Sequence, residues 1–327
     1  MTEPTVTFSG GSRPVAPLGV GAWSWGDSST WGMGTYDADL SEATIAAAVD
    51  ASLDAGVTLV DTAEGYGNGE SERIIGRLLA ADPSRRDRMV IATKFIPMPW
   101  KLDVKGALRR SLEASLGRLG VDQVELYQIH GPISLRSHRA LADALAAVVQ
   151  DGLTAAVGVS NYSVAEMTRI HRALGDHGVP LASNQIEFSL LRRRPETSGL
   201  LAACEQLGVV PLAYSPIGQG RLTGKYSAAA PPPGKRNFSA HPMEQVDAVV
   251  SVVRTIGEAH GRTPSQVALR WLVQKGAVPI PGAKNAEQAS QNAGALGWEL
   301  SPTDMAALDA AALEGTNSLA NRVWQHG

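Results

Sequence analysis

The chain contains four polar residues of the types needed to place a proton on a carbonyl oxygen: Asp61, Tyr66, Lys94 and His130. Asp61 and Lys94, if they meet, would pair behind the hydroxyl of Tyr66. A phenol has a reference pKa of about 10, and a nearby ammonium group favours the phenolate, so we expect Lys94 to lower the pKa of Tyr66. Tyr66 would then act as a general acid as hydride reaches the carbonyl carbon, while His130 holds the same oxygen by a hydrogen bond.

Taken singly, each of these residues has a more ordinary explanation. An aspartate that ends a strand more often caps the next turn, and a tyrosine after a loop glycine usually packs. A lysine that closes a strand is usually solvated or structural. A lone histidine more often has its ring nitrogens hydrogen-bonded to neighbouring groups in a structural role than a role in catalysis. The functional interpretation therefore depends on a fold that brings the four positions together.

A repeating unit along the chain predicts such a fold. A helix-like stretch ends at a glycine, a short apolar run follows, and a polar cluster closes the unit. Ile45, Val49 and Leu53 show the spacing of one such helix, with Ser41 as its expected N-cap. Glycine supplies the left-handed residue that ends a helix, and a spacing of roughly 30 residues fits one βα module. The helix-ending glycines are Gly56, Gly120, Gly152, Gly178 and Gly208.

Eight short runs rich in β-branched residues are the expected strands, and their lack of clean alternation is typical of strands buried on both faces. They cover roughly residues 18–23, 57–61, 89–94, 124–130, 155–160, 183–187, 209–214 and 277–280. Eight alternating βα units predict an α/β fold, a (β/α)8 TIM barrel, with residues 1–327 as a single domain that ends in a C-terminal tail. The Pro-rich segment 219–243 after the seventh strand is too long for an ordinary connection. We interpret it as a loop over the barrel mouth rather than a dispensable insertion.

Polar residues stand at the carboxyl ends of these strands. Asp61 ends the second strand, Lys94 the third and His130 the fourth. The next three strands end at Ser160 and Asn161, at Gln185, and at Tyr214 and Ser215. Barrel enzymes keep their active sites at the rim where these ends meet, so we expect the side chains to converge there.

Composition and missing motifs exclude several other classes of protein. The chain has 44% apolar and 19% charged residues, typical of a globular protein, and its net charge of −3 gives no attraction to nucleic acid or anionic membranes. Cys204 is the only cysteine, which excludes an intramolecular disulfide. Glycine motifs of Rossmann and P-loop sites and metal-ligand spacings are absent, so we expect no metal. Without a signal-peptide pattern or a long apolar run, we expect a cytoplasmic protein.

Several motifs resemble those of the aldo-keto reductase superfamily, in the branch that contains pyridoxal reductases and potassium-channel β subunits. In chain order they read DTAEGYGNGESE, ATK, LYQIHGP, VGVSNYS, SNQIEFSLL, AYSPIGQGRLTGKY and IPGAKNAEQASQNAGAL. The resemblance covers about residues 15–300. It implies a (β/α)8 barrel, NADPH-dependent reduction of aldehydes or ketones, and a catalytic set of Asp61, Tyr66, Lys94 and His130, with Tyr66 as the general acid.

The resemblance also implies a binding site for NADPH. Ser160, Asn161 and Gln185 would hold the nicotinamide carboxamide, and Tyr214 would stack on its ring. The phosphates would meet the segment Ser215, Pro216, Ile217 and Gly218, together with Lys225 and Arg236. The adenosine end would meet Gly282, Lys284, Gln288, Gln291 and Asn292. A lysine at position 284 suits the 2′-phosphate, which favours NADP over NAD.

One position departs from the resembling proteins, which often carry an aromatic residue after the catalytic histidine. Here the residue is Gly131, so the pocket wall is expected to be open or filled from elsewhere. Alternatively, the glycine serves the backbone before a proline. The residues that could fill the wall are Trp23, Trp25, Trp31 and Trp324.

These observations leave more than one function open. The favoured function is reduction of a small carbonyl substrate, by a monomer or weak homo-oligomer with no nucleic-acid or membrane partner. A cofactor-binding regulatory or interaction subunit, like the channel β subunits, is the alternative, because those subunits retain the same four residues; the lack of a long N-terminal extension counts against a channel role. A third possibility is a specialised reductase of a sugar ketone or of pyridoxal.

Overall fold

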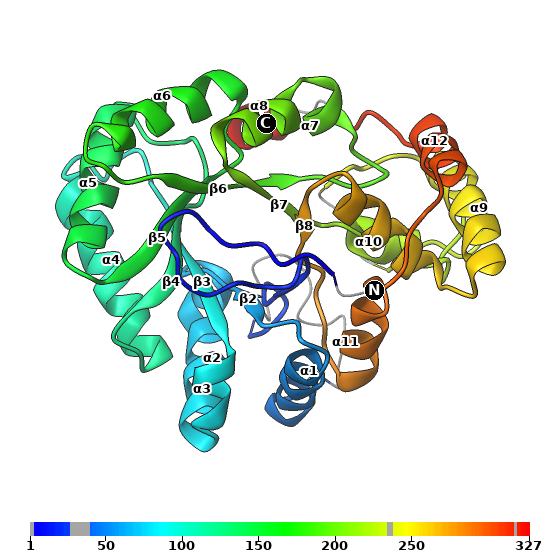
Figure 1. The fold of residues 1–327 in the computed structure, drawn as a ribbon, viewed down its shortest axis with the longest axis horizontal. Coiled ribbons are helices and arrows are strands. Elements are labelled where there is room, and N and C mark those ends of the chain that lie inside the picture. Colours follow the sequence, from blue (N-terminus) through cyan, green and yellow to red (C-terminus); the bar gives the residue numbers. More distant parts are fainter. Residues whose placement is uncertain (1–2, 27–39, 234–237, 317–318) are drawn as a thin grey trace.

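In the computed structural model, which describes residues 3–26, 40–233, 238–316 and 319–327, eight parallel strands follow one another in chain order (Figure 1). They are β1 (Gly19–Gly21), β2 (Leu59–Asp61), β3 (Val90–Phe95), β4 (Val124–Ile129), β5 (Thr154–Ser160), β6 (Leu181–Glu187), β7 (Val210–Tyr214) and β8 (Val278–Pro279). The barrel closes where the amide of Gly21 donates to the carbonyl of Pro281 and Gly21 pairs in parallel with Gly282. The predicted (β/α)8 barrel is confirmed.

The seam between β1 and β8 is shorter than the sequence indicated. Pro279 and Pro281 have no backbone N–H and cannot extend a regular ladder of hydrogen bonds. A Cβ atom on Gly21 would lie 2.7 Å from the carbonyl oxygen of Ile280, so the two chains approach too closely for a side chain at this position. The barrel is therefore closed by a backbone contact rather than by two long strands.

Helices surround the barrel in the order expected of alternating βα units (Figure 1). Ser41 caps the first helix by accepting from the backbone N–H of Thr44, and Ile45, Val49 and Leu53 form its buried face, as predicted. The five helix-ending glycines all have φ between 65° and 79°. The helices are α1 (Glu42–Asp54), α2 (Glu70–Ala81), α3 (Ser84–Arg88), α4 (Val104–Leu119), α5 (His138–Gln150), α6 (Val164–Gly175), α7 (Arg194–Thr197), α8 (Leu200–Leu207), α9 (Met243–His260), α10 (Pro264–Gln274), α11 (Ala286–Ala293), α12 (Pro302–Ala311) and α13 (Leu319–Trp324), with 3-10 turns at η1 (Tyr66–Gly69) and η2 (Gly218–Thr223).

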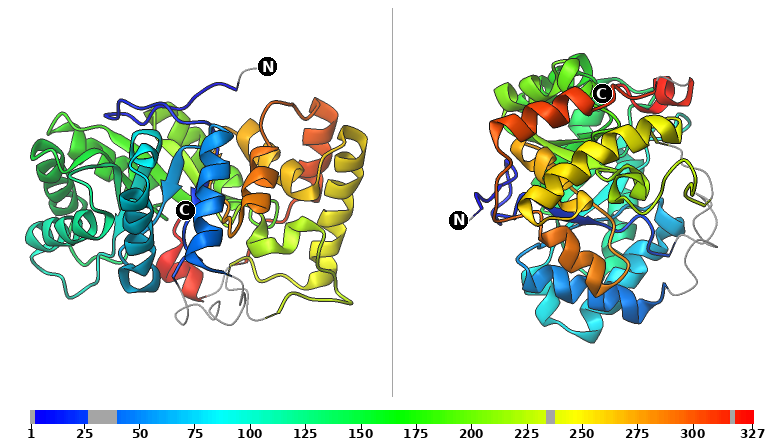
Figure 2. Two further views of the ribbon diagram at one scale, coloured as in Figure 1. Left: turned by 90° about the horizontal axis from the view of Figure 1, so that it is seen from below. Right: turned by 90° about the vertical axis from the view of Figure 1, so that its right-hand side faces the viewer.

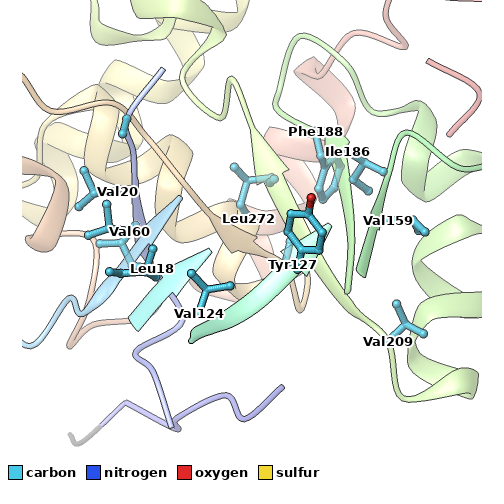
Figure 3. Close-up of a cluster of buried hydrophobic side chains, with 14 of the residues drawn as sticks. Leu18, Val20, Val60, Val124, Tyr127, Val159, Ile186, Phe188, Val209 and Leu272 are labelled. Carbon is cyan, nitrogen blue, oxygen red and sulfur yellow. The ribbon is translucent and has the colours of Figure 1, made fainter. Parts of the chain in front are cut away.

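Two apolar layers hold the barrel together. The larger layer includes strand residues such as Val60 and Tyr127 and the inner faces of the helices (Figure 3). The alternate strand residues form a second cluster that includes Phe8 and Val15 from the N-terminal segment, 2% and 1% exposed. This segment crosses the end of the barrel opposite α13 (Figure 2). One end of the barrel is thus closed by apolar packing, which leaves the carboxyl ends of the strands for a site. None of the helices in the described residues is both long and apolar enough to span a membrane.

Candidate active site

A cavity of about 1190 Å³ lies at the carboxyl ends of the strands. Asp61, Tyr66 and His130 line it, and Lys94 is completely buried within hydrogen-bonding distance of Tyr66. The barrel thus brings together the four residues singled out in the sequence, from the carboxyl ends of β2, β3 and β4 and from the turn after β2.

The ammonium group of Lys94 makes three hydrogen bonds behind the cavity wall. Its Nζ donates to Asp61 Oδ1 at 2.5 Å, to the carbonyl of Thr62 at 2.8 Å and to the hydroxyl of Tyr66 at 3.1 Å. An ammonium group has three N–H donors, so these partners satisfy all of them and fit the charged form. The ring of His130 meets the ring of Tyr66 edge-on, with centroids 5.6 Å apart. Tyr66 is therefore held between a cation and an imidazole.

Burial dominates the protonation of this cluster. Burial lowers the pKa of His130 well below its usual range, and the Lys94 charge lowers it further, so the imidazole is neutral near pH 7. Burial alone would lower the pKa of Lys94, but the charges of Asp61 and Tyr66 and their hydrogen bonds raise it overall.

Lys94 acts on the pKa of Tyr66 in the expected direction, but burial outweighs it, so the net shift is upward. Burial raises the pKa of Tyr66, the charge and hydrogen bond of Lys94 oppose this only in part, and the charge of Asp61 adds to the rise. The phenol is therefore protonated near neutral pH. That is the form from which a proton can be donated.

Two side-chain amides hold the other oxygen of Asp61. Gln185 Nε2 donates to Asp61 Oδ2 at 2.8 Å, and Gln128 Nε2 donates to the same oxygen at 3.2 Å. Gln128 lies opposite Lys94 in the register of β3 and β4 and was missed in the sequence. An amide within the apolar run of β4 was the signal that could have identified it. The carboxylate is thus fixed from both sides, which orients the oxygen that meets Lys94.

The same cavity gathers most of the residues implied to bind a dinucleotide. Its wall carries Ser160, Asn161, Gln185, Tyr214, Ser215, Pro216, Ile217, Lys225, Gly282, Lys284, Gln288, Gln291 and Asn292. Gly218 does not line the cavity. It is buried with φ +58°, and a Cβ atom there would lie 2.6 Å from Leu191, so it shapes the turn instead. Arg236 lies outside the described residues.

Side-chain hydrogen bonds connect the polar residues near Tyr66. The hydroxyl of Tyr214 donates to Asn161 Oδ1 at 2.9 Å, and the side-chain amide of Asn161 donates to Ser160 Oγ at 3.2 Å. Asn161 and Ser215 have φ of 64° and 50°, which is uncommon for residues other than glycine. Such backbone strain is often kept at functional sites. Here it occurs directly after β5 and β7, where the side chains turn into the cavity.

One of the tryptophans considered for the pocket wall lies in the core instead. Trp25 is completely buried in the hydrophobic core, and its indole N–H donates to the carbonyl of Ala283 at 2.8 Å. The prediction that Trp25 lines the pocket is therefore wrong, because its polar atom is satisfied inside the protein. Trp31 lies outside the described residues.

The space beside Gly131 is filled rather than open. Trp23 and Trp324 line the cavity, and a Cβ atom on Gly131 would lie 3.1–3.2 Å from ring carbons of Trp324. The ring of Trp324 also meets His130 edge-on at 5.6 Å between centroids. Gly131 does not have a positive φ, so the backbone does not require glycine here. The C-terminal tail thus provides the aromatic wall next to the histidine.

This packing predicts the outcome of Gly131→Trp. The new ring and Trp324 cannot occupy one space, so overpacking should cost about 1–3 kcal/mol of stability and lower kcat/KM for bulky and small aldehydes alike. The double variant Gly131→Trp/Trp324→Ala should recover both, because one aromatic ring again fills the wall. Thermal midpoints and kcat/KM for one bulky and one small aldehyde measure this. If the double variant is as impaired as the single one, the two positions do not share a space.

Sequence comparison identifies the family to which this geometry belongs. The profile of the Aldo/keto reductase family matches residues 17–313. The chain belongs to this family. Pyridoxal reductase, chloroplastic, from Arabidopsis thaliana is 36% identical over 327 residues, covering 96% of this chain and 88% of that protein. A 6-dehydroglucose reductase from Novosphingobium aromaticivorans is 32% identical and covers 86% of each chain.

Solved structures agree with this aldo/keto reductase assignment. The glycerol dehydrogenase from Gluconobacter oxydans superimposes with a TM-score of 0.81 at 27% identity, covering 98% of this chain and 99% of that one. An aldo-keto reductase from Klebsiella pneumoniae in complex with NADPH superimposes with a TM-score of 0.76 at 27% identity, covering 97% and 98%. The family resemblance carried by the motifs is therefore confirmed, and these relatives are oxidoreductases.

Proposed function

We propose that this aldo/keto reductase reduces an aldehyde or ketone to an alcohol with NADPH, and that Tyr66 is the general acid. The observation that carries the proposal is the 3.1 Å hydrogen bond from Lys94 Nζ to the hydroxyl of Tyr66 at the cavity wall. It combines a protonated phenol with a cation that stabilises the phenolate left after proton transfer. The NADPH complex of the Klebsiella relative supports the choice of cofactor.

The residues in the cavity fit a phosphorylated dinucleotide. Its volume, about 1190 Å³, exceeds the usual range of about 300–1,000 Å³ for small-ligand pockets. Asn161 and Gln185 offer amides for the nicotinamide carboxamide, beside the aromatic ring of Tyr214. Lys284 lines the cavity just before α11, whose N-terminus Asn285 caps. A cation next to a helix N-terminus suits the 2′-phosphate of NADPH.

The proposed chemistry assigns each residue a single task. When bound, the dinucleotide supplies a hydride to the carbonyl carbon. Tyr66 donates its proton to the carbonyl oxygen, and Lys94 stabilises the resulting phenolate while Asp61 balances the charge of Lys94. His130 is neutral, so it can donate a hydrogen bond to the oxygen, on which negative charge develops, without placing a second buried cation beside Lys94. The phenolate regains its proton from solvent after the alcohol leaves.

Turnover of carbonyl compounds tests the proposal. The purified protein is mixed with NADPH and, in turn, with 4-nitrobenzaldehyde, pyridoxal and a keto sugar, and oxidation of NADPH is followed. Pyridoxal is a candidate because of the activity named for the Arabidopsis relative, and the aromatic walls of Trp23 and Trp324 suit a flat ring. We expect turnover of at least one aldehyde. Tight NADPH binding without any turnover would favour the regulatory-subunit alternative.

Replacing Lys284 by alanine is expected to weaken the binding of NADPH more than that of NADH. Only NADPH carries the 2′-phosphate, and a hydrogen bond to a charged group is worth about 1.5–3 kcal/mol, so the difference should be about 10- to 100-fold. Fluorescence titration with both cofactors measures it. Lys105→Ala, which removes an exposed lysine on α4, is the matched control. Equal losses for the two cofactors would show that Lys284 does not contact the phosphate.

A further inference from the structure

Glu187 is a buried carboxylate that the proposed chemistry does not use. It is the last residue of β6 and only 2% exposed. Its Oε1 accepts from the hydroxyl of Ser239 at 2.5 Å, and its Oε2 accepts from the side-chain amide of Gln325 at 2.6 Å. Arg192 Nε lies 3.8 Å from the same Oε2. Two segments far apart in the sequence, one after β7 and one at the C-terminus, thus meet at one side chain.

Ser239 connects Glu187 to the loop between β7 and α9. Its φ is 47°, a left-handed conformation unusual for serine. Arg221 supports this turn, because its guanidinium donates to the carbonyls of Ser239 and Phe238, both at 2.6 Å. Phe238 lines the cavity and meets the ring of Tyr214 edge-on at 5.3 Å between centroids. The turn therefore presses this loop against the ring expected to stack on the nicotinamide.

Gln325 connects Glu187 to the C-terminal tail. Its side-chain nitrogen donates to the hydroxyl of Tyr214 at 2.6 Å as well as to Glu187. Its neighbour in the chain is Trp324, which fills the space beside Gly131. A displacement of Gln325 would therefore also move the aromatic wall of the substrate pocket.

A buried carboxylate is unfavourable unless donors surround it. Burial raises the pKa of Glu187, and the hydrogen bonds of Ser239 and Gln325 act against this rise together with the charges of Arg192 and Arg221. If either donor leaves, one carboxylate oxygen stays unsatisfied inside the protein. Each donor also fixes the rotamer that the other one needs. The docked positions of the loop and of the tail therefore stabilise each other.

We propose that Glu187 is a positioning residue that couples the loop after β7 to the C-terminal tail, so that NADPH bound against the loop also fixes Trp324 in the substrate wall. The inference rests on the proposed function, because it takes the cavity that Lys225, Tyr226 and Phe238 of this loop line as the NADPH site. In its consequence, bound NADPH stabilises Trp324 in the wall position beside Gly131.

Hydrogen exchange of the full chain, with and without NADPH, tests the coupling. Peptides covering residues 282–292 report cofactor binding, and peptides covering 319–327 report the tail. In the wild-type protein NADPH should slow exchange at both, and coupling between sites typically amounts to about 5–150-fold. In Ser239→Ala the protection of 282–292 should remain and that of 319–327 should be lost. Ser52→Ala removes the hydroxyl of a buried serine that bonds only within α1, so it should behave as the wild type.

Kinetics provide a second measurement. At saturating NADPH, Ser239→Ala should raise KM for the aldehyde by about tenfold and change kcat less. The variant loosens the substrate wall formed by Trp324 but leaves the general acid Tyr66 in place. A merely structural defect would instead lower kcat through a smaller active fraction, at unchanged KM. Glu187→Gln should also raise KM more than it changes kcat. If Glu187→Gln does not fold, the kinetics of Ser239→Ala alone test the coupling.

The outcomes separate this inference from the proposed function. Absence of NADPH protection at 282–292 in the wild type would overturn the proposed function itself. Protection at 282–292 without any at 319–327 in the wild type would overturn the coupling alone. The coupling would also be overturned if NADPH protected the tail of Ser239→Ala as well as it protects that of the wild type. Loss of protection at both segments in Ser239→Ala would overturn it too, because Ser239 would then serve only cofactor binding.

Discussion

Tyr66→Phe is expected to lower kcat for aldehyde reduction by about 10²–10⁴-fold, the usual contribution of a general acid, with NADPH affinity nearly unchanged. Phenylalanine keeps the ring that meets His130 and removes only the hydroxyl. Lys94 loses one acceptor but keeps Asp61 and the Thr62 carbonyl, so its charge stays compensated. The variant should therefore fold, and its defect should lie in the proton transfer.

Steady-state kinetics at saturating NADPH and a fluorescence titration of NADPH measure the two quantities. Tyr127→Phe is the matched control, because Tyr127 is also buried and its hydroxyl donates to the Leu108 carbonyl at 3.3 Å, away from the cavity. That control should retain the wild-type kcat. A kcat of Tyr66→Phe within a few-fold of the wild type would remove Tyr66 from the role of general acid.

The repeat of helix, glycine and apolar strand made the fold predictable from sequence. Each unit carries its own signals: Gly120 with φ 67° ends α4, and Ser41 begins α1. Because a barrel places every strand end on one rim, knowing the strand ends was enough to predict that Asp61, Lys94 and His130 converge. Local sequence signals thus predicted that residues distant along the chain lie close together in space.

The remaining features depend on contacts that no local signal encodes. Trp23 and Trp25 stand two positions apart in one segment, yet one lines the cavity and the other is buried in the core. The pKa of Tyr66 follows from how deeply the fold buries it, which the types of its neighbours do not reveal. The ring of Trp324 fills the space beside Gly131 although the two residues are far apart in the sequence, so this contact is visible only in the folded structure.

The buried pair of Asp61 and Lys94 predicts the second large effect, on stability. Lys94→Met should lower the free energy of unfolding by about 3–5 kcal/mol, because it leaves the carboxylate of Asp61 buried without its cation. Methionine is close to lysine in length, so packing changes little. Arg88→Met removes one partner of an exposed ion pair, Arg88 with Asp54 at 2.8 Å, and should cost no more than about 1 kcal/mol.

Combining Lys94→Met with Asp61→Asn separates stability from function. The asparagine is neutral, and its side-chain oxygen can still accept from Gln128 and Gln185, which now donate to Asp61 Oδ2 at 3.2 and 2.8 Å. The double variant should therefore regain most of the lost stability in urea unfolding, since replacing both members of a buried pair is often neutral. Its kcat should stay low, because no cation remains beside Tyr66. Equal stability of the single and double variants would mean that Lys94 is not needed to compensate a buried charge. A recovered kcat would mean that the lysine does not assist the proton transfer.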